Sequence, residues 1–226
     1  MRKSGVFILS HGRPDKVYTY DTIRKLGYDG PIVIVCDDQD ETIQKYRDNF
    51  GADNVMVFDK MEQVKKCDTF SNNPKMGVIL YARNVCFELA EKLGWTHFVE
   101  LDDDYFSFIH QYVGKDDNGL SVMKRIVITD RLGELFDATF DLLDDTNALT
   151  VAFAQGGDNI GGVYNTQLMT HLTKRKAMNS FFCRTDRPFK FSGYVNEDVN
   201  FYTMNGMRGQ LVFQTNRVYL NQHQTQ

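Results

Sequence analysis

The sequence has no hydrophobic run long enough to cross a lipid bilayer. Its longest apolar stretches, such as residues 6–9 and 32–36, are far shorter than the ~20 residues that a membrane-spanning helix needs. The apolar stretch near the N-terminus ends at the polar residues 10–13, which is too early for a secretory signal peptide. We therefore expect a cytoplasmic protein with no membrane partner.

Cysteine is scarce, and its spacing is wrong for a metal site. The four cysteines lie far apart without a CxxC pair, and the five histidines show no HExxH motif. These spacings argue against a zinc site or a disulfide framework, and they indicate a reducing, intracellular compartment. The chain also lacks internal repeats and low-complexity linkers. Its 226 residues, 42% of them hydrophobic, suit one soluble globular domain.

Charge is unevenly distributed along the chain. The net charge is −4, yet residues 165–226 carry eight Lys or Arg against three Asp or Glu. That segment has a balance of +5, which leaves −9 for residues 1–164. A basic C-terminal part indicates an anionic partner, although a solvated surface face explains the charge equally well.

The first half of the chain alternates between strand and helix patterns. Apolar, often β-branched runs predict strands at residues 6–10, 31–36, 54–58 and 96–101, and amphipathic segments predict helices at residues 16–26, 40–50 and 82–93. This rhythm predicts the α/β class, with a mostly parallel sheet flanked by helices. Ligands bind beyond the carboxyl ends of the strands in such sheets.

The second half is less regular. Patterns predict helices near residues 132–143 and 196–205, and strands near residues 149–154, 181–183 and 211–213. We expect these elements to complete a single mixed α/β domain.

Polar residues follow the first-half strands. Asp38, after the second strand, can accept a hydrogen bond from a pyrimidine N–H or a ribose hydroxyl, or it can simply begin the next helix. Arg13 and Arg83 can each hold a diphosphate through a bidentate fork. Arg83 lies at the start of a predicted helix, where the helix dipole disfavours a cation, so an anion that binds there would explain it better.

Three consecutive acids, Asp102-Asp103-Asp104, follow the fourth strand. Alternate side chains of an extended segment point the same way, so Asp102 and Asp104 can converge on one cation. Mg²⁺ and Mn²⁺ favour such oxygen ligands, completed by water and substrate phosphates. The aromatic residues at 105, 106 and 108 are interpreted as a lid over this site. The competing interpretation is an acidic turn in which Asp104 caps a following helix.

Two further motifs allow two interpretations each. Gly156-Gly157, at the end of a predicted strand, permits close backbone approach to a ligand, and a tight turn explains the pair equally well. Glu197-Asp198 opens a predicted helix, where acids normally complement the helix dipole. The alternative role for this pair is a general base that faces the substrate.

Together these residues resemble the GT-A family of nucleotide-sugar-dependent glycosyltransferases. The matching segments occur in family order over nearly the whole chain, at residues 7–13, 35–38, 82–84, 101–105 and 196–198. More narrowly, the segments YARN, LDDDY, FSGYVNEDVNFYT and LNQHQTQ look like the phage TET-associated glycosyltransferases. That group resembles enzymes that attach sugars to hydroxymethylated pyrimidines in DNA. A phage-encoded protein of this kind would act in the host cytoplasm.

The resemblance implies a GT-A, Rossmann-like domain over residues 1–226 that transfers a hexosyl or pentosyl group. Residues 1–110 would bind the nucleotide sugar, a UDP-sugar being favoured, and residues 111–226 would bind the acceptor. The donor-binding residues would be Ser10, Arg13, Asp38, Arg83, Asp102, Asp103, Gly156 and Gly157. Asp102 and Asp104 would form a DXD motif that binds Mn²⁺ or Mg²⁺. His223 would be the third ligand, in place of the later segment that many GT-A enzymes have.

The resemblance also assigns the acceptor side. Asp198, or Glu197, would take the proton from the acceptor hydroxyl. The acceptor would be a hydroxymethylpyrimidine in duplex DNA. Lys174, Arg175 and Lys176 are the predicted contacts to the DNA backbone, because three adjacent cations without acidic partners would otherwise repel one another.

Three other functions stay open. A sugar nucleotidyltransferase shares a related sheet, but it usually has a Gly-rich loop and a lysine after its first strand, whereas residues 10–14 contain one glycine. A glycosyltransferase that acts on a protein or a glycan would share the donor site. A non-catalytic nucleotide-sugar or DNA-binding module would need no base, so the Glu197-Asp198 pair argues against it.

Overall fold

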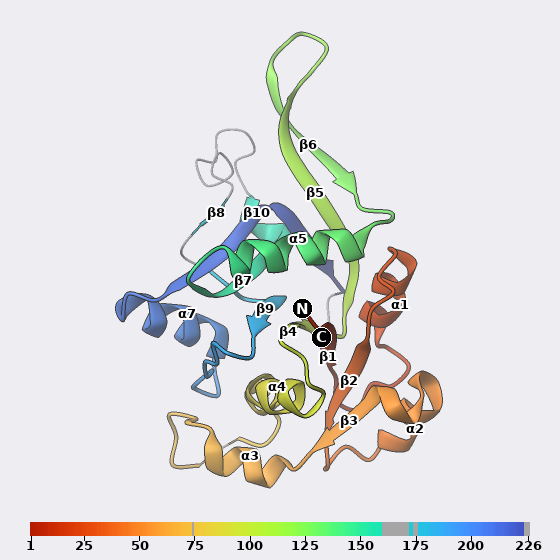
Figure 1. Ribbon diagram of the computed structural model, residues 1–226, viewed down its shortest axis with the longest axis vertical. Coiled ribbons are helices and arrows are strands. Elements are labelled where there is room, and N and C mark those ends of the chain that lie inside the picture. The colour runs from red at the N-terminus through yellow and green to blue at the C-terminus, as the bar shows by residue number, and fades with distance from the viewer. Residues whose placement is uncertain (74, 160–171, 174–175, 224–226) are drawn as a thin grey trace.

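A computed structural model describes residues 1–73, 75–159, 172–173 and 176–223. Figure 1 shows a sheet with helices on both faces and a two-stranded ribbon that projects from one end of the molecule. Within the described residues the sheet has ten strands, nine of them in the order β3-β2-β1-β4-β9-β7-β10-β5-β6 and β8 beside β10. The predicted α/β class is confirmed.

The first-half strands are parallel to one another. They are β1 (Ser4–Leu9), β2 (Ile32–Asp37), β3 (Val55–Phe58) and β4 (His97–Asp102). Each begins and ends within two residues of its prediction. Every residue of β2 is buried, which explains its β-branched composition, because a parallel strand covered on both faces has no polar side.

The helices lie in two layers. They are α1 (Tyr18–Lys25), α2 (Ile43–Phe50), α3 (Lys60–Lys66), α4 (Leu80–Lys92), α5 (Leu132–Asp144) and α7 (Glu197–Met207), with short 3₁₀ helices η1 (Ala52–Asn54) and η2 (Gly156–Asn159). α1, α2 and α5 contribute to the core on one face of the sheet. α3, α4 and α7 contribute to the core on the other face. Of the α-helices in the described residues, the sequence patterns missed α3 and found the other five.

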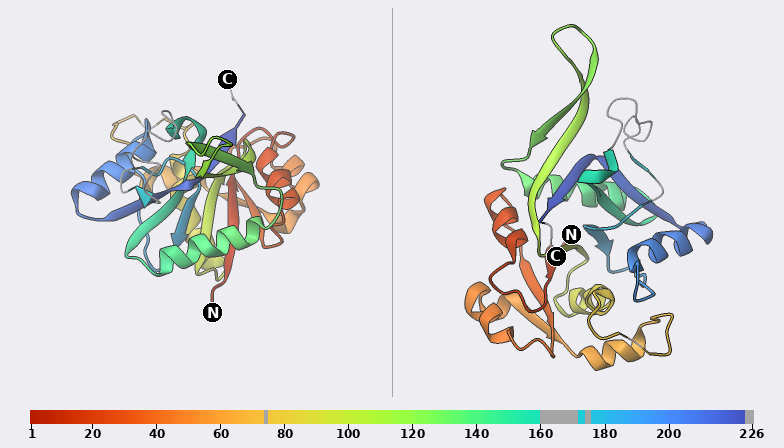
Figure 2. Two further views of the ribbon diagram at one scale, coloured as in Figure 1. Left: turned by 90° about the horizontal axis from the view of Figure 1, so that it is seen from above. Right: turned by 180° about the vertical axis from the view of Figure 1, so that it is seen from behind.

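The second half of the sheet is mixed. It contains β5 (Tyr105–Lys115), β6 (Ser121–Val127), β7 (Ala148–Gln155), β8 (Leu172–Thr173), β9 (Phe181–Arg184) and β10 (Leu211–Gln222). β9 is antiparallel to both β4 and β7, so β7 runs in the direction of β4. β10 is parallel to β7. The carboxyl ends of β1, β2, β4, β7 and β10 therefore lie along one edge of the sheet, which the two views of Figure 2 help to follow.

The predicted aromatic lid is wrong. Tyr105 and Phe108 belong to β5 and are fully buried in the same core, while Phe106 is 46% exposed. The alternative interpretation also fails, because a strand and not a helix follows Asp104. No helix among the described residues is both long and apolar enough to span a membrane.

Candidate active site

A cavity of about 320 Å³ opens at the carboxyl ends of β1 and β2. Its volume lies at the lower end of the range for small-molecule sites. Its polar wall consists of Ser10, His11, Arg13, Asp37 and Lys60, and its apolar wall includes Phe58, Ile79 and Tyr81. Four of these five polar residues follow or end a strand, as expected for an α/β sheet, and Lys60 begins α3 shortly after β3.

A buried ion pair lies at the wall of this cavity. The Asp37 carboxylate is 3.1 Å from Lys60 Nζ and 2.8 Å from His11 Nδ1. Asp38, the residue that the sequence favoured, is exposed, and its carboxylate accepts a hydrogen bond from the backbone N–H of Lys60 at 3.0 Å. The carboxylate that lines the cavity is thus Asp37. Alternation cannot distinguish the two acids, because β2 is buried on both faces.

The middle acid of the triplet anchors the loop after β1. Asp103 is buried, and its carboxylate accepts hydrogen bonds from Ser10 Oγ at 2.6 Å and Arg13 Nη2 at 2.7 Å. Burial raises the pKa of Asp103 to about 6, against the opposing effects of the Ser10 hydrogen bond and the Arg13 charge. The hydroxyl of Tyr46 lies 2.7 Å from Ser10 Oγ and completes this cluster. The structure thus brings together three of the predicted donor residues.

The first acid of the triplet is held by two neighbours. Asp102 Oδ1 accepts from Arg83 Nη2 at 3.2 Å, and Asp102 Oδ2 accepts from the Tyr105 hydroxyl at 3.0 Å. Burial raises the pKa of Tyr105 well above its usual value, so this hydroxyl keeps its proton at neutral pH. The orientation of Asp102 is therefore fixed before any ligand binds.

Arg83 is a buried cation surrounded by acids. Its side chain is 4% exposed, and its guanidinium lies 3.3 Å from Glu197, 3.2 Å from Asp102 and 3.9 Å from Glu100. The ring of Phe181 packs on it at 4.9 Å. Burial lowers the pKa of Arg83, and the three carboxylates raise it by more. The negative charge expected beside Arg83 is thus supplied by carboxylates of the protein itself. Through these contacts Arg83 links α4 to β4 and to the start of α7.

Glu100 is the site-adjacent residue that sequence reasoning missed. It is fully buried in β4, and neither of its carboxylate oxygens has a hydrogen-bond partner within the described residues. Burial raises its pKa to about 8, although the charge of Arg83 lowers it. The signal in the sequence was a single acid within a predicted strand, with the apolar residues Val99 and Leu101 directly before and after it.

The third acid lies beside the end of β10. Asp104 is buried, and its backbone carbonyl accepts a hydrogen bond from the backbone N–H of His223 at 2.9 Å. The His223 ring packs between Tyr18 and Phe106, with centroid separations of 4.5 and 4.7 Å. The two residues are thus neighbours, although about 120 positions separate them in the sequence.

The acids of this turn suit a hard cation. Within the described residues, no group of three or more His, Cys, Asp or Glu side chains is arranged to hold a metal. Mg²⁺ and similar cations are commonly held by one or two carboxylates, with substrate phosphates and water as the other ligands. The predicted ligands Asp102 and Asp104 are carboxylates of this kind.

Glu197 and Asp198, the two acids proposed from the sequence as general-base candidates, lie in the first turn of α7. Asn196 precedes the helix in a left-handed conformation, with φ 51°. Glu197 accepts from Arg83 Nε, whereas Asp198 accepts a hydrogen bond from the backbone N–H of Val199 at 2.7 Å. The carboxylate of Asp198 is therefore less constrained than that of Glu197.

The remaining predicted residues lie elsewhere along the same edge or outside the described residues. A Cβ on Gly156 would lie 2.9 Å from Asn221 Oδ1, so this glycine allows η2 to approach β10. Gly157 is exposed with open space around it. Lys176 is half-buried, and Lys174 and Arg175 lie outside the described residues.

A model of the TET-associated glycosyltransferases matches residues 4–226. The chain belongs to this glycosyltransferase family. No curated protein matches it significantly. Among solved structures, TarS from S. aureus is similar with a TM-score of 0.51 and 17% identity, over 97% of this chain and 36% of the TarS chain.

A second similar structure is the glucosyl-3-phosphoglycerate synthase of Mycobacterium tuberculosis, in complex with Mn²⁺, UDP and phosphoglyceric acid. Its TM-score is 0.50 at 13% identity, over all of this chain and 72% of that chain. These structural similarities show that this chain has the GT-A glycosyltransferase fold.

Proposed function

We propose that the protein transfers a sugar from a UDP-sugar to the hydroxymethyl group of a modified pyrimidine in duplex DNA, with a divalent cation. One observation carries the proposal. The Asp102–Asp104 turn, the cavity with Asp37 and the start of α7 with Asp198 all lie at the carboxyl edge of one sheet. The similar synthase that contains UDP and Mn²⁺ supports the choice of donor, and the family supports the choice of acceptor.

The cavity would bind the nucleoside part of the donor. Asp37 presents a buried carboxylate that can accept the N–H of a uracil ring, and Lys60 Nζ lies 3.1 Å from it. Arg13 uses Nη2 for Asp103, which leaves other N–H groups of its half-exposed guanidinium for a phosphate oxygen. Asp103 in turn holds Arg13 and Ser10 at the mouth of the cavity.

The acidic turn would bind the cation. Asp102 and Asp104 are the proposed carboxylate ligands, and His223 lies beside Asp104. When bound, Mn²⁺ or Mg²⁺ would neutralise negative charge that develops on the leaving UDP. Arg83 and Tyr105 fix the Asp102 carboxylate, so little reorganisation is needed on binding.

Asp198 is the proposed general base. It would accept the proton of the hydroxymethyl group as the oxygen attacks the sugar. Glu197 suits this role less well, because Arg83 already engages its carboxylate. The start of α7 stabilises negative charge on both acids through the helix dipole.

A donor and acceptor screen tests the proposal. The protein would be incubated with a panel of nucleotide sugars and Mn²⁺, and the release of nucleoside diphosphate would be measured with and without hydroxymethylated duplex DNA. We expect UDP release that rises with hydroxymethylated DNA but not with unmodified DNA, and that stops when EDTA removes the metal. Stimulation by a protein or a glycan in place of DNA would support the alternative acceptor. Pyrophosphate release from a sugar phosphate and a nucleoside triphosphate would indicate a nucleotidyltransferase.

A further inference from the structure

The ribbon of β5 and β6 extends beyond the body of the protein (Figures 1 and 2). β5 pairs with β10 from Tyr105 to His110, and with β6 from Ile109 to Lys115. Beyond His110, within the described residues, the ribbon therefore has two strands. We call residues 109–127 the arm. An isolated two-stranded hairpin is marginally stable, so a long free ribbon adds little to the core and points to a binding role.

The arm differs in charge from the rest of the chain. Its strands carry Lys115, Lys124 and Arg125 and no carboxylate, in a protein whose net charge is −4. The acids of the arm, Asp116 and Asp117, lie in the terminal turn, where the Asp116 carboxylate accepts hydrogen bonds from two backbone N–H groups. Lys124 and Arg125 are exposed, and no salt bridge to either is found in the described part of the chain. This charge distribution complements a polyanion.

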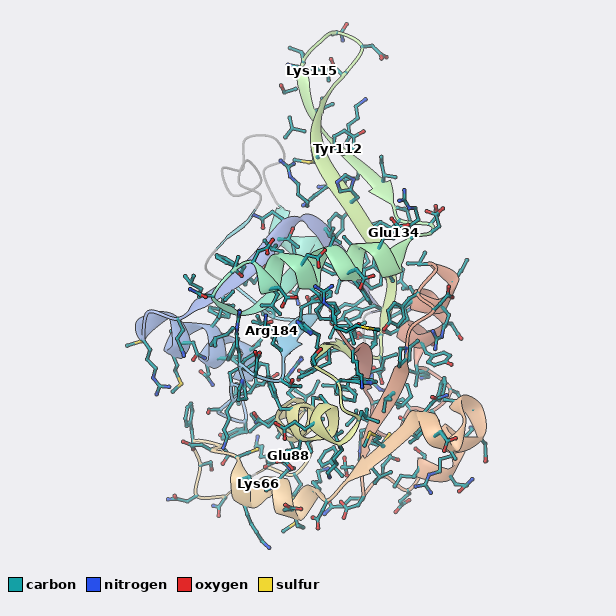
Figure 3. The ribbon with its side chains drawn as sticks, viewed as in Figure 1. Lys66, Glu88, Tyr112, Lys115, Glu134 and Arg184 are labelled. Atoms are coloured by element: carbon teal, nitrogen blue, oxygen red, sulfur yellow. The ribbon has the colours of Figure 1, made fainter. Side chains whose placement is uncertain are left out.

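Aromatic side chains accompany these cations. His110 and Tyr112 occupy alternate positions of β5 and so share one face. The rings of His110 and Tyr112 stack at 5.5 Å, and Figure 3 shows Tyr112 and Lys115 on the arm away from the body. Lys124 lies opposite Tyr112 in the strand pairing. Rings beside cations bind nucleic acids through stacking and phosphate contacts.

Gly114, in the β5 strand of the arm, makes room for Lys124. A Cβ on Gly114 would lie 3.0–3.1 Å from the Cγ, Cδ and Cε atoms of Lys124. The aliphatic part of Lys124 therefore lies across the glycine. A larger residue at position 114 would displace Lys124.

A second copy of the chain fits the arm less well. β6 is an edge strand, and its Ile126 and Val127 are 52% and 54% exposed, which could favour pairing between copies. Antiparallel self-pairing of a seven-residue strand centred on Lys124 would place Lys124 opposite its counterpart, with Arg125 adjacent. Like charges in opposed positions destabilise such pairing. The same two cations favour a phosphate backbone.

The arm is also connected directly to the candidate active site. β5 begins at Tyr105, immediately after Asp104. Its eleven residues span about 36 Å, close to one helical turn of DNA at about 34–36 Å. A two-stranded ribbon fits the major groove. A duplex held along the arm would thus have one nucleotide near the acidic turn, where a base flipped out of the stack can react.

We propose that the arm is the docking element for the duplex DNA acceptor, with Lys115, Lys124 and Arg125 as contacts to the phosphate backbone. This inference rests on the proposed function. It adds a DNA-binding surface to the predicted one at residues 174–176. Contacts to the backbone fix the position of the duplex without reading its sequence. The arm would therefore bind duplexes of suitable length whatever their sequence.

The test is the double substitution Lys124→Ala/Arg125→Ala. Binding of a 24-base-pair duplex (about two turns) that contains hydroxymethylcytosine would be measured by fluorescence anisotropy at several salt concentrations. We expect a loss of affinity of about 10-fold or more, and a salt slope smaller by about 2, because each lost phosphate contact removes about 0.9 from the slope. UDP affinity in the presence of Mn²⁺, measured by calorimetry, should be unchanged.

The matched control is Lys65→Ala/Lys92→Ala. Both lysines are exposed, on α3 and at the end of α4, and Figure 1 shows these two helices in the half of the molecule away from the arm. This variant loses the same total charge and should bind DNA within about 2-fold of the parent. Lys115→Ala is a milder second variant in case the double substitution unfolds the arm, and it should reduce the slope by about 1.

The outcomes separate the two proposals. If the parent glycosylates hydroxymethylated DNA and the arm variant binds and modifies it equally well, the arm inference is wrong and the proposed function stands. If the parent binds no duplex at low salt and transfers sugar to a protein or glycan instead, both are wrong. If the arm variant loses self-association in sedimentation and keeps its affinity for DNA, the arm binds a second copy and the inference fails.

Discussion

At the scale of single residues, Arg83 connects the parts of the site. Its guanidinium touches Asp102, Glu197 and Glu100 inside the protein. We expect Arg83→Met to destabilise the fold by about 3–5 kcal/mol, because removal of one partner leaves buried charges uncompensated. Urea denaturation at neutral pH measures this loss.

Arg83→Lys is the matched variant. It keeps the positive charge but loses the planar fork that engages Asp102 and Glu197 at once. We expect it to recover part of the stability that Arg83→Met loses. A methionine variant within about 1 kcal/mol of the parent, a value typical of ordinary substitutions, would show that the cluster contributes little to the fold.

The proposed base gives a second prediction at this scale. Asp198→Asn should reduce sugar transfer to hydroxymethylated DNA by roughly 10²–10⁴-fold, the range for a lost general base. UDP binding should persist, because Asp198 lies on α7 and not at the nucleoside cavity. Glu197→Gln is the control, measured with the same assay. Full activity in Asp198→Asn together with its loss in Glu197→Gln would exchange the roles of the two acids.

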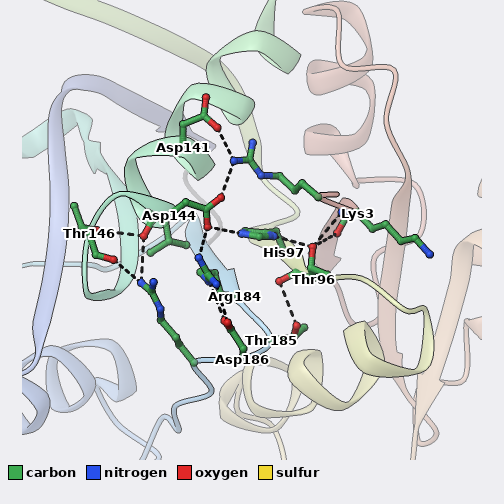
Figure 4. A network of polar contacts seen from close by, with 12 residues as sticks. Lys3, Thr96, His97, Asp141, Asp144, Thr146, Arg184, Thr185 and Asp186 are labelled. Atoms are coloured by element: carbon green, nitrogen blue, oxygen red, sulfur yellow. Dashed lines mark hydrogen bonds and ion pairs between the residues drawn. The ribbon is translucent and has the colours of Figure 1, made fainter.

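At the scale of elements, Asp144 fastens the end of α5 to the sheet. Its carboxylate accepts hydrogen bonds from Arg2, from His97 at the start of β4 and from Arg184 at the end of β9, as Figure 4 shows. Burial alone would raise the pKa of Asp144, but its hydrogen bonds with Arg2 and His97 and the nearby positive charges lower it to about 2.

The sign of the pH dependence follows from this shift. A carboxyl group whose pKa is lower in the folded state stabilises the fold above its unfolded pKa of about 4, and this contribution is lost as the pH falls through about 2. We expect Asp144→Asn to lower the free energy of unfolding by about 2 kcal/mol at pH 7 and to differ little from the parent near pH 2. Denaturant titrations at both pH values measure the difference.

Asp186→Asn is the control for the Asp144 substitution. Asp186 also pairs with Arg184, but its side chain is 62% exposed, and exposed ion pairs contribute at most about 1 kcal/mol. An equal effect of the two substitutions at both pH values would contradict the role assigned to Asp144.

Strands that are continuous apolar runs were predicted from the sequence, and a strand that changes from buried to exposed along its length was missed. β2 is a continuous run of buried β-branched residues, so composition alone identifies it. β5 begins with Tyr105 and Phe108 buried in the core, has an irregular register against β10 there, and ends as an exposed ribbon, so no single period describes it. The aromatic residues of β5 were read as a lid for this reason.

The candidate site was predictable where it follows strand ends. Ser10, Arg13 and Asp103 were found from that rule, and the structure brings their side chains together. The partners of the other acids in the site were not predictable, since Lys60 and Tyr105 meet their carboxylates through tertiary contacts. A local pattern contains no information about such contacts.

At the scale of the whole molecule, ligand binding would connect the two halves of the chain. The nucleoside cavity belongs to residues 9–82, and the proposed cation ligands lie between β4 and the end of β10. A ligand that binds the folded protein and not the unfolded chain stabilises it by RT ln(1 + [L]/Kd), about 2.7 kcal/mol at 100 times Kd. UDP with Mn²⁺ should therefore raise the melting temperature by roughly 5–10 °C for a protein of this size. UDP alone should raise it by less, because the cation would neutralise the repulsion between the diphosphate and the acidic turn.

Asp104→Asn should abolish the part of the shift in melting temperature that depends on Mn²⁺, because it removes a proposed cation ligand. It should keep the fold, since it removes only one of three adjacent acids. Thermal unfolding of both proteins with UDP, with Mn²⁺ and with the two together measures these shifts. A melting temperature that rises equally with and without Mn²⁺ in the parent protein would overturn the assignment of the cation to this turn.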